Sequence, residues 1–526
     1  MRTQGDQGNT ARASLLNRAC RLAGAAAILA LAGCAGGPSA PSASRSDGPV
    51  KVTPQRDWSD AVLYFVILDR FADGSGANNT NVNRANPGGF HGGDFAGLTA
   101  QLDEIAELGA TAIWITPVAR QIDYCPPAQA PTGVTVPGGW FEHCAFHGYW
   151  ADDYQTIDPR FGTEAELKAL VEAAHARGIK VLLDVVYNHV GYDSHYLRDH
   201  PDWFRTKPVD CAVDELNCQV GGLPDFRTEL PEVQDYLLNA QLGLAERTGL
   251  DGFRLDTVKH IDHSFWQRHR RETRERVNPD FFLLAEVWGG SATVLDDYFV
   301  HDEMNAGFDF TFKGSCESFV QGKGRTIAFA SYLEKRHKVR QGYHLAHYMS
   351  SHDEPLALYN LGGDLGALRL CVALQMTSLG IPTIYYGEEV ARDGSVWPLN
   401  RNDMPWGSRD VLPGKGAKRD DSLRDYYRKL IEARRQNTAL SRGTFKRLSS
   451  DGDLLVFERF DAAAGNAVVV AVNRGQAEAS ASVAAPAAWT GAVGEALTGA
   501  AAAVADGKLN IVVPPRQARV YVPKPN

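Results

Sequence analysis

Helical patterns of apolar residues, each ending at a glycine and followed by a short apolar run, occur four times along the chain. In one example, the pattern of residues 163–177 ends at Gly178 and IKVLLDVVYNH follows. Thr163 and Glu166 have the spacing of a capping box, and glycine favours the left-handed conformation after a helix end. Strands that are apolar on both faces and alternate with helices indicate a parallel sheet.

Eight strand-like runs lie between residues 57 and 435. Four follow the helical patterns that end at Gly109, Gly178, Gly249 and Gly380. The other four are the runs 62–71, 281–288, 306–312 and 343–354. Eight strands favour a closed (β/α)8 TIM barrel over an open sheet. The longest insertions, at 119–156 and 190–230, each follow a strand, so we expect both at the end of the barrel where active sites form.

The pattern changes after residue 435. Runs such as NAVVVAVN and KLNIVVPP are separated by turn residues, as is typical of a small antiparallel β domain. We therefore predict an α/β fold in which a catalytic barrel spans 57–435 and a C-terminal antiparallel β domain spans 436–526.

The N-terminal segment resembles an export signal rather than part of the fold. Residues 22–32 form an apolar run behind three arginines, and this run is too short to span a bilayer. LAGC, ending at Cys34, resembles the lipobox of bacterial lipoproteins, in which the cysteine is acylated. We expect a signal at 1–33 and an acylated flexible tether at 34–56, which would hold the protein on a bacterial cell-envelope membrane. An ordinary cleaved signal is the alternative.

Composition narrows the function classes. The chain has 526 residues and a formal net charge of -9, which argues against a general nucleic-acid-binding protein. Six cysteines would remain after signal removal and acylation, and export permits disulfides. Two pairs flank short loop-like segments and are placed to form disulfides: Cys125 with Cys144, and Cys211 with Cys218. Cys316 and Cys371 lie in apolar surroundings and are expected to be free. We expect a monomer.

Charged residues gather where several predicted strands end. Arg254 and Asp256 lie two apart in GFRLDTVKH, so their side chains point the same way, and the arginine keeps the carboxylate ionised. Other strand ends carry acidic and histidine side chains in DVVYNH, LLAEVW and SSHDE. Unpaired buried carboxylates are costly, so their convergence at one end of a barrel indicates function. A glutamate with a raised pKa opposite an ionised aspartate is the arrangement for glycoside cleavage.

These four segments, in this order and spacing, resemble the signature regions of the alpha-amylase family of glycoside hydrolases. HGYWADDY (147–154) and LPDF (223–226) resemble two further family segments. The resemblance implies a (β/α)8 barrel, a loop domain of about 190–233 inserted after the third strand, and a C-terminal β-sandwich.

The resemblance also implies roles for single residues. Asp256 would be the nucleophile, Glu286 the general acid and then base, and Asp353 the residue that binds the distorted sugar. Lys259 and His260 would reach the next sugar on the leaving-group side. The substrate-binding set as a whole comprises Tyr149, Asp184, His189, Arg254, Lys259, His260 and His352.

Calcium is the expected ion. DGSGANN (73–79) with GGD (92–94) resembles a calcium loop of cyclodextrin glucanotransferases, although Ser75 stands where asparagine is expected. A second set resembles the family's common calcium site. The first set comprises Asp73, Asn78, Asn79, the Gly92 carbonyl and Asp94, and the second comprises Asn188, Asp225 and the His260 carbonyl. Both offer oxygen ligands, which suit calcium.

The sequence leaves more than one function open. The first is a retaining hydrolase of α-1,4-glucosidic bonds in starch, maltodextrins or related α-glucans. The alternatives are a transglycosylase resembling cyclodextrin glucanotransferase, and an enzyme resembling cyclomaltodextrinase or neopullulanase. A catalytically dead glycan-binding protein is disfavoured because all three acidic positions are present.

Overall fold

The computed structural model describes residues 49–51, 55, 57–489 and 493–523. The expected signal segment and Cys34 lie outside these residues. Among the described helices, none has both the length and the apolarity needed to cross a membrane.

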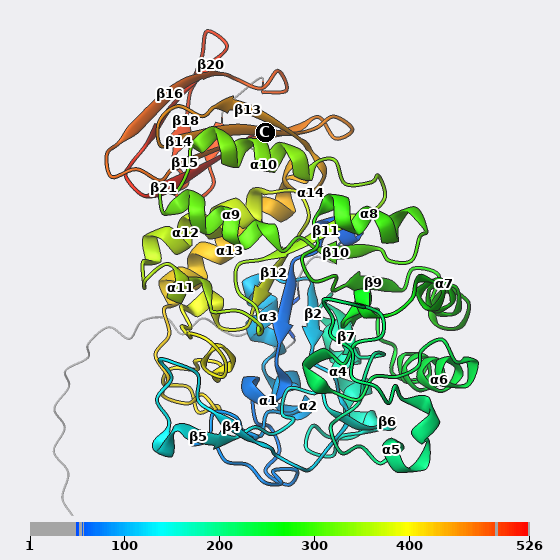
Figure 1. The fold of residues 1–526 in the computed structure, drawn as a ribbon. Helices are drawn as coiled ribbons and strands as arrows, with labels where there is room; N and C mark the ends of the chain where they lie inside the picture. Colours follow the sequence, from blue (N-terminus) through cyan, green and yellow to red (C-terminus); the bar gives the residue numbers. More distant parts are fainter. Residues whose placement is uncertain (1–48, 52–54, 56, 490–492, 524–526) are drawn as a thin grey trace, which may run out of the picture. The chain divides into compact units, whose positions relative to one another are not determined.

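Eight parallel strands close into a barrel, which confirms the predicted TIM barrel (Figure 1). The barrel strands in chain order are β1 (Leu63–Val66), β2 (Ala112–Ile115), β7 (Lys180–Val185), β8 (Gly252–Leu255), β9 (Phe282–Ala285), β10 (Ala306–Phe308), β11 (His344–Tyr348) and β12 (Ile381–Tyr385). Each of the eight runs named from the sequence contains one of them. Closure joins β1 to β12, with Leu63 opposite Thr383.

Helices alternate with these strands, as the sequence pattern predicts. The main ones are α2 (Phe95–Ala100), α3 (Leu102–Leu108), α4 (Glu164–Ala176), α6 (Pro231–Thr248), α7 (His263–Glu272), α8 (Ala292–Val300), α9 (Thr311–Val320), α10 (Thr326–Arg336), α12 (Leu365–Thr377) and α13 (Asp421–Gln436). The capping box at the start of α4 is confirmed, because Glu166 N donates to Thr163 Oγ1 while Thr163 N donates to Glu166 Oε2. Gly249 ends α6 in the left-handed conformation, with φ +76°.

The insertion after β2 forms two small sheets at the rim of the barrel. β3 (Ala119–Gln121) pairs with β6 (Ala151–Ile157), and β4 (Pro127–Gln129) pairs with β5 (Trp140–Glu142). The insertion after β7 contains only short helical turns, such as α5 (Tyr196–Asp199). Each insertion is tied by one disulfide, and these are the two pairings named from the sequence: Cys125–Cys144 and Cys211–Cys218. Cys316 and Cys371 are free and buried.

Two antiparallel sheets follow the short helix α14 (Thr438–Arg442). One contains β13 (Thr444–Ser449), β14 (Leu454–Asp461), β15 (Asn466–Asn473), β21 (Gln517–Pro523), β17 (Val493–Glu495) and β18 (Ala501–Ala502). The other contains β16 (Ala479–Ala484), β20 (Lys508–Val513) and β19 (Val504–Ala505).

The strands of the larger sheet pack on both faces. Val456 and Val469 join the apolar cluster that holds Ile511 of the smaller sheet. Phe457 and Val470, one residue further along, belong instead to the cluster that contains the barrel core. Because side chains alternate across a strand, one sheet covers the sandwich core on one side and the barrel helices on the other.

Candidate active site

The carboxyl ends of β7, β8 and β9 bring three acidic side chains around Arg254. Strand register places them there: Asp184 lies opposite Arg254, and Leu255 lies opposite Ala285, so the next residues, Asp256 and Glu286, are also neighbours. One terminal nitrogen of the guanidinium donates to Asp184 at 3.1 Å and to Asp256 at 2.8 Å. The other is 2.5 Å from Glu286 Oε1.

Asp184 is held by donors on several sides. Besides its bond from Arg254, its Oδ2 accepts from Trp114 Nε1 at 3.0 Å and from the Tyr149 hydroxyl at 2.7 Å. The indole of Trp114 also lies under the guanidinium, 5.0 Å from ring centroid to Arg254 Cζ. Asp184, which the sequence placed in the substrate-binding set, therefore has the contacts of a support for Arg254.

Glu286 is placed to hold a proton at neutral pH. Burial raises its pKa to about 8. The positive charge of Arg254 lowers this pKa, whereas the negative charges of Asp256 and Asp353 raise it. Its Oε2 accepts a hydrogen bond from the Thr257 backbone at 3.1 Å. A buried carboxyl that stays protonated beside an ionised aspartate has the properties of a general acid.

Asp353 is kept ionised by the side chains around it, and it stays accessible to solvent at the cavity. Burial by itself would raise its pKa, but His352, Arg401 and Arg254 outweigh this effect and lower the pKa. Arg401 contacts both Asp353 and His352. Its Nη2 is 3.1 Å from Asp353 Oδ1, and its Nε donates to the His352 carbonyl at 2.8 Å. Arg401 was not predicted from the sequence; it lies in the turn Leu399–Arg401 beyond the last barrel strand.

Two buried imidazoles face this cluster without a complete set of partners. Burial lowers the pKa of His189, and lowers the pKa of His352 to about 3, so both rings are neutral. Within the described residues, His189 Nε2 and His352 Nδ1 have no hydrogen-bond partner. Such orphaned nitrogens suit ligand hydroxyls. The ring of Tyr149 stacks on His352 at 5.4 Å between centroids.

A cavity of about 590 Å³ opens over these groups. It is lined by all three acidic residues named as catalytic, Asp256, Glu286 and Asp353. Aromatic side chains not singled out from the sequence also line it: Trp150, Tyr192, Trp288 and Trp397. Of these, Trp288 is 51% exposed although it is large and apolar, so a ring face is available for stacking on a sugar.

Comparison with known proteins decides the family. A family model described as "Alpha amylase, catalytic domain" matches residues 65–211 and 215–405. The chain belongs to the alpha-amylase family. The roles given to single residues of this glycoside hydrolase from its motifs stay predictions, and the geometry described above is compatible with them.

Similar proteins include enzymes with several named activities. The cyclomaltodextrinase of Bacillus sp is 30% identical over 435 residues, which cover 77% of this chain and 71% of that protein. Neopullulanase 2 of Thermoactinomyces vulgaris is 30% identical over 431 residues, 76% of this chain and 67% of that protein. The alpha-amylase of Geobacillus thermoleovorans, solved with acarbose, superimposes with a TM-score of 0.75 at 31% identity, covering 89% of this chain and 99% of that one.

In this family member, Lys259 and His260 lie in the turn Val258–His260 directly after β8. Both line the catalytic cavity. Both also contact Glu215, a residue of the insertion after β7 that the motifs did not single out.

The first expected calcium set is brought together. Asp94 accepts from Asn78 Nδ2, and Asp73 accepts from Asn79 Nδ2. Asn78 Oδ1 and Asn79 Oδ1 are buried without a partner among the described residues. Gly92 has φ +92°, and a Cβ there would lie 2.4 Å from Asn79 Oδ1. Oxygen donors without partners around a glycine backbone fit a calcium ion.

The second set fits less well. Asp225 Oδ2 accepts from Arg205 Nε at 2.8 Å, so a guanidinium already stands beside this carboxylate. Its other oxygen has no partner among the described residues. Burial raises the pKa of Asp225 to about 7 in spite of Arg205. The second ion at Asn188, Asp225 and the His260 carbonyl therefore stays a prediction, and it would have to share Asp225 with Arg205.

The pH dependence tests the coupling between Asp353 and Glu286. The general acid must be protonated, so kcat/KM should fall as the pH rises through the Glu286 pKa of about 8. Asp353→Asn removes a negative charge that raises this pKa, so the basic limb should move to lower pH. The measurement is kcat/KM against pH on a soluble α-glucan.

Asp193→Asn is the matched control, because Asp193 is exposed and does not line the cavity. Its basic limb should stay with that of the wild type. A limb that does not move in Asp353→Asn, at measurable activity, would contradict the coupling.

Proposed function

We propose that this protein is a retaining hydrolase of α-1,4-glucosidic bonds in starch, maltodextrins or related α-glucans. The observation that carries the proposal is that one guanidinium, that of Arg254, contacts both Asp256 and Glu286. This arrangement keeps the two carboxyl groups close together. A separation of roughly 5–5.5 Å is required for retention, whereas inverting enzymes need room for a water molecule.

The reaction follows from this geometry in two steps. Asp256 attacks the anomeric carbon while Glu286 gives its proton to the departing glycosidic oxygen, which leaves a covalent glycosyl-enzyme. Glu286, now a carboxylate, takes a proton from an incoming water, which displaces Asp256 from the same face that the leaving group vacated. Asp353 and the neutral His189 and His352 line the cavity, where they would bind hydroxyls of the reacting sugar.

Transglycosylation, and action on small or cyclic α-glucans, are further activities that the site and the relatives support. A sugar hydroxyl that occupies the leaving-group side can take the place of water in the attack on the glycosyl-enzyme, which gives transglycosylation. The relatives named cyclomaltodextrinase and neopullulanase favour an enzyme that also accepts small or cyclic α-glucans.

Product analysis tests the function. The purified protein should release reducing sugars from maltoheptaose and starch, and NMR of the first products should show the α anomer. The same digest of pullulan and β-cyclodextrin distinguishes a starch hydrolase from a cyclomaltodextrinase-like enzyme, because the latter should open β-cyclodextrin faster than it cleaves starch.

Asp256→Asn is the control for this site, since it keeps the size of the side chain and removes the nucleophile. It should lose several orders of magnitude in kcat with an unchanged circular dichroism spectrum. First products in the β form, or a variant that keeps a tenth of the activity, would refute the mechanism.

We also propose one bound calcium ion, held by Asp73, Asn78, Asn79, the Gly92 carbonyl and Asp94. The support is the pair of buried amide oxygens without partners and the buried Asp94, whose pKa is raised by burial. Its role would be to stabilise the loop between β1 and α2. Arg84 also contacts Asp73, so the ion and the guanidinium would share this carboxylate.

Calcium removal should lower the melting temperature. A ligand at a hundred times its Kd stabilises the native state by about 2.7 kcal/mol, so EDTA should lower Tm and added calcium should restore it. Asp73→Ala should reduce this shift, and Ser75→Asn, which restores the expected asparagine, should increase it. A Tm that ignores both EDTA and calcium, with no metal found by elemental analysis, would remove the ion from this account.

The third proposal concerns localisation and rests on sequence, because Cys34 lies outside the described residues. We propose that acylation of Cys34 anchors the protein to a bacterial cell-envelope membrane. Two or more acyl chains hold a protein stably, whereas one gives reversible binding. The protein should sediment with membranes, and Cys34→Ala should be soluble or unprocessed. Unchanged sedimentation of a processed Cys34→Ala would contradict the anchor.

A further inference from the structure

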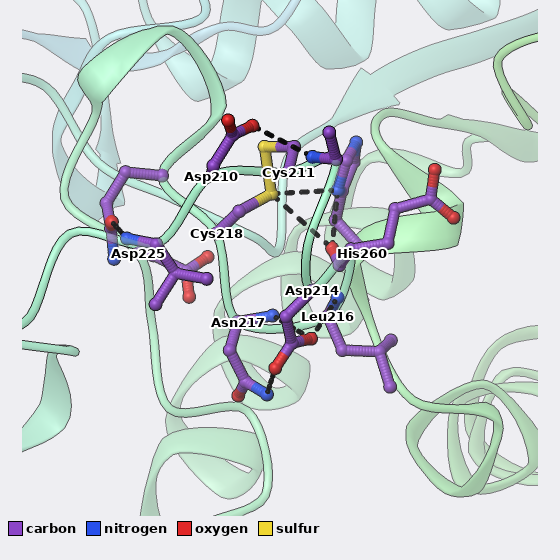
Figure 2. The surroundings of a disulfide bond; sticks show 12 residues. Asp210, Cys211, Asp214, Leu216, Asn217, Cys218, Asp225 and His260 are labelled. Atoms are coloured by element: carbon purple, nitrogen blue, oxygen red, sulfur yellow. Dashed lines mark hydrogen bonds between the residues drawn. A yellow bond between two sulfur atoms is a disulfide. The ribbon is translucent and has the colours of Figure 1, made fainter.

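The insertion after β7 carries a small ring of chain closed by the Cys211–Cys218 disulfide. Figure 2 shows this ring beside His260. Cys211 lines the same cavity as Asp256 and Glu286. The ring therefore forms part of the wall of the catalytic cavity.

One residue of the ring, Glu215, binds two successive residues of the turn after β8. Its carbonyl oxygen accepts from His260 Nδ1 at 2.7 Å. Its carboxylate Oε1 is 2.5 Å from Lys259 Nζ. Because a carbonyl oxygen only accepts, Nδ1 of His260 carries a proton. Glu215 thus fixes the ring orientation of His260 and the direction of the Lys259 side chain.

The disulfide keeps Glu215 available for these contacts. Cys218 Sγ lies 3.6 Å from His260 Nδ1. Within the ring, Asp214 accepts hydrogen bonds from the backbone of Leu216 and Asn217 (Figure 2). A half-exposed ion pair such as Lys259–Glu215 contributes little on its own, because ordering two long side chains costs entropy. Closing the chain into a short ring restricts the backbone that carries Glu215, so holding this loop in place costs less conformational entropy.

The turn that Glu215 binds also touches the general acid. Thr257 N donates to Glu286 Oε2, and Val258 N donates to the Glu286 carbonyl at 3.1 Å. Thr257 has φ +50°, which is unusual for a residue other than glycine. The position of this turn therefore depends on contacts from both sides, with Glu286 on one and Glu215 on the other.

We propose that Glu215, held by the Cys211–Cys218 disulfide, is a positioning residue for the sugar on the leaving-group side. It orients Lys259 and His260, and so sets the affinity of the glycosyl-enzyme for a sugar acceptor relative to water. This inference rests on the proposed function. The ring closed by Cys211 and Cys218 thereby controls the balance between transglycosylation and hydrolysis.

Maltotriosyl α-fluoride with maltose as acceptor tests this role, because fluoride leaves without occupying a sugar position on the leaving-group side. The variants are Glu215→Gln, which keeps the ring closed, and the double variant Cys211→Ser/Cys218→Ser, which opens it. In both, the KM for maltose in the transfer reaction should rise about five- to tenfold, as for the loss of one charge-assisted hydrogen bond. The fold-change in this KM should be larger than any fold-change in the rate of fluoride hydrolysis measured without maltose.

Two matched controls belong to the experiment. Glu275→Gln changes the charge of an exposed glutamate outside the cavity lining, and Cys125→Ser/Cys144→Ser removes the disulfide of the other insertion. Neither should raise the maltose KM. Should the ring-opened variant fail to fold, Glu215→Gln still decides the matter.

The outcomes separate this inference from the function on which it rests. A maltose KM that is unchanged in Glu215→Gln, or a wild-type enzyme that transfers nothing to maltose, overturns the role of Glu215. A wild-type enzyme that does not hydrolyse the fluoride contradicts the proposed function instead.

Discussion

The buried guanidinium of Arg254 is the contact on which the rest of the site depends. It joins Asp184, Asp256 and Glu286 at the base of the cavity, where all four side chains are largely buried. The raised pKa of Glu286 keeps that residue protonated, which lowers the negative charge that the single guanidinium has to offset. Removing one partner from a buried ionic cluster costs about 3–5 kcal/mol, so the cluster acts as one unit in both stability and chemistry.

Strand register turns this cluster into a catalytic arrangement. In the parallel barrel, β7 contributes Asp184 from near its carboxyl end, and β8 and β9 contribute Asp256 and Glu286 from directly after their last residues. The insertions then supply the outer wall: Tyr149 from the segment after β2, and Glu215 from the segment after β7. The barrel thus places the reacting groups, while the insertions decide what can approach them.

The sequence was sufficient for the barrel and for the residues at its strand ends. Runs such as those containing β7 and β9 are apolar on both faces, as is typical of a parallel sheet covered on both sides. The number of such runs favoured a closed barrel, and their polar ends are visible in the sequence itself. Arg401, Glu215 and Arg205 were not predicted. Each lies in a segment without a clear period and meets its partner through the path of a loop, which local patterns do not encode. The contact of Arg205 with Asp225 was likewise not visible in the matching oxygens of the second calcium set, which stays a prediction.

The pairing of β1 with β12 has a consequence for how the chain reaches this state. Leu63 of β1 and its partner Thr383 of β12 are separated in the chain by the six other barrel strands. A chain cut short before Ile381 would keep two unpaired edges, on β1 and on β11, and exposed edges of this kind recruit other chains. Such long-range pairing also forms slowly. Truncated or stalled copies should therefore accumulate as aggregates rather than as smaller folded enzymes.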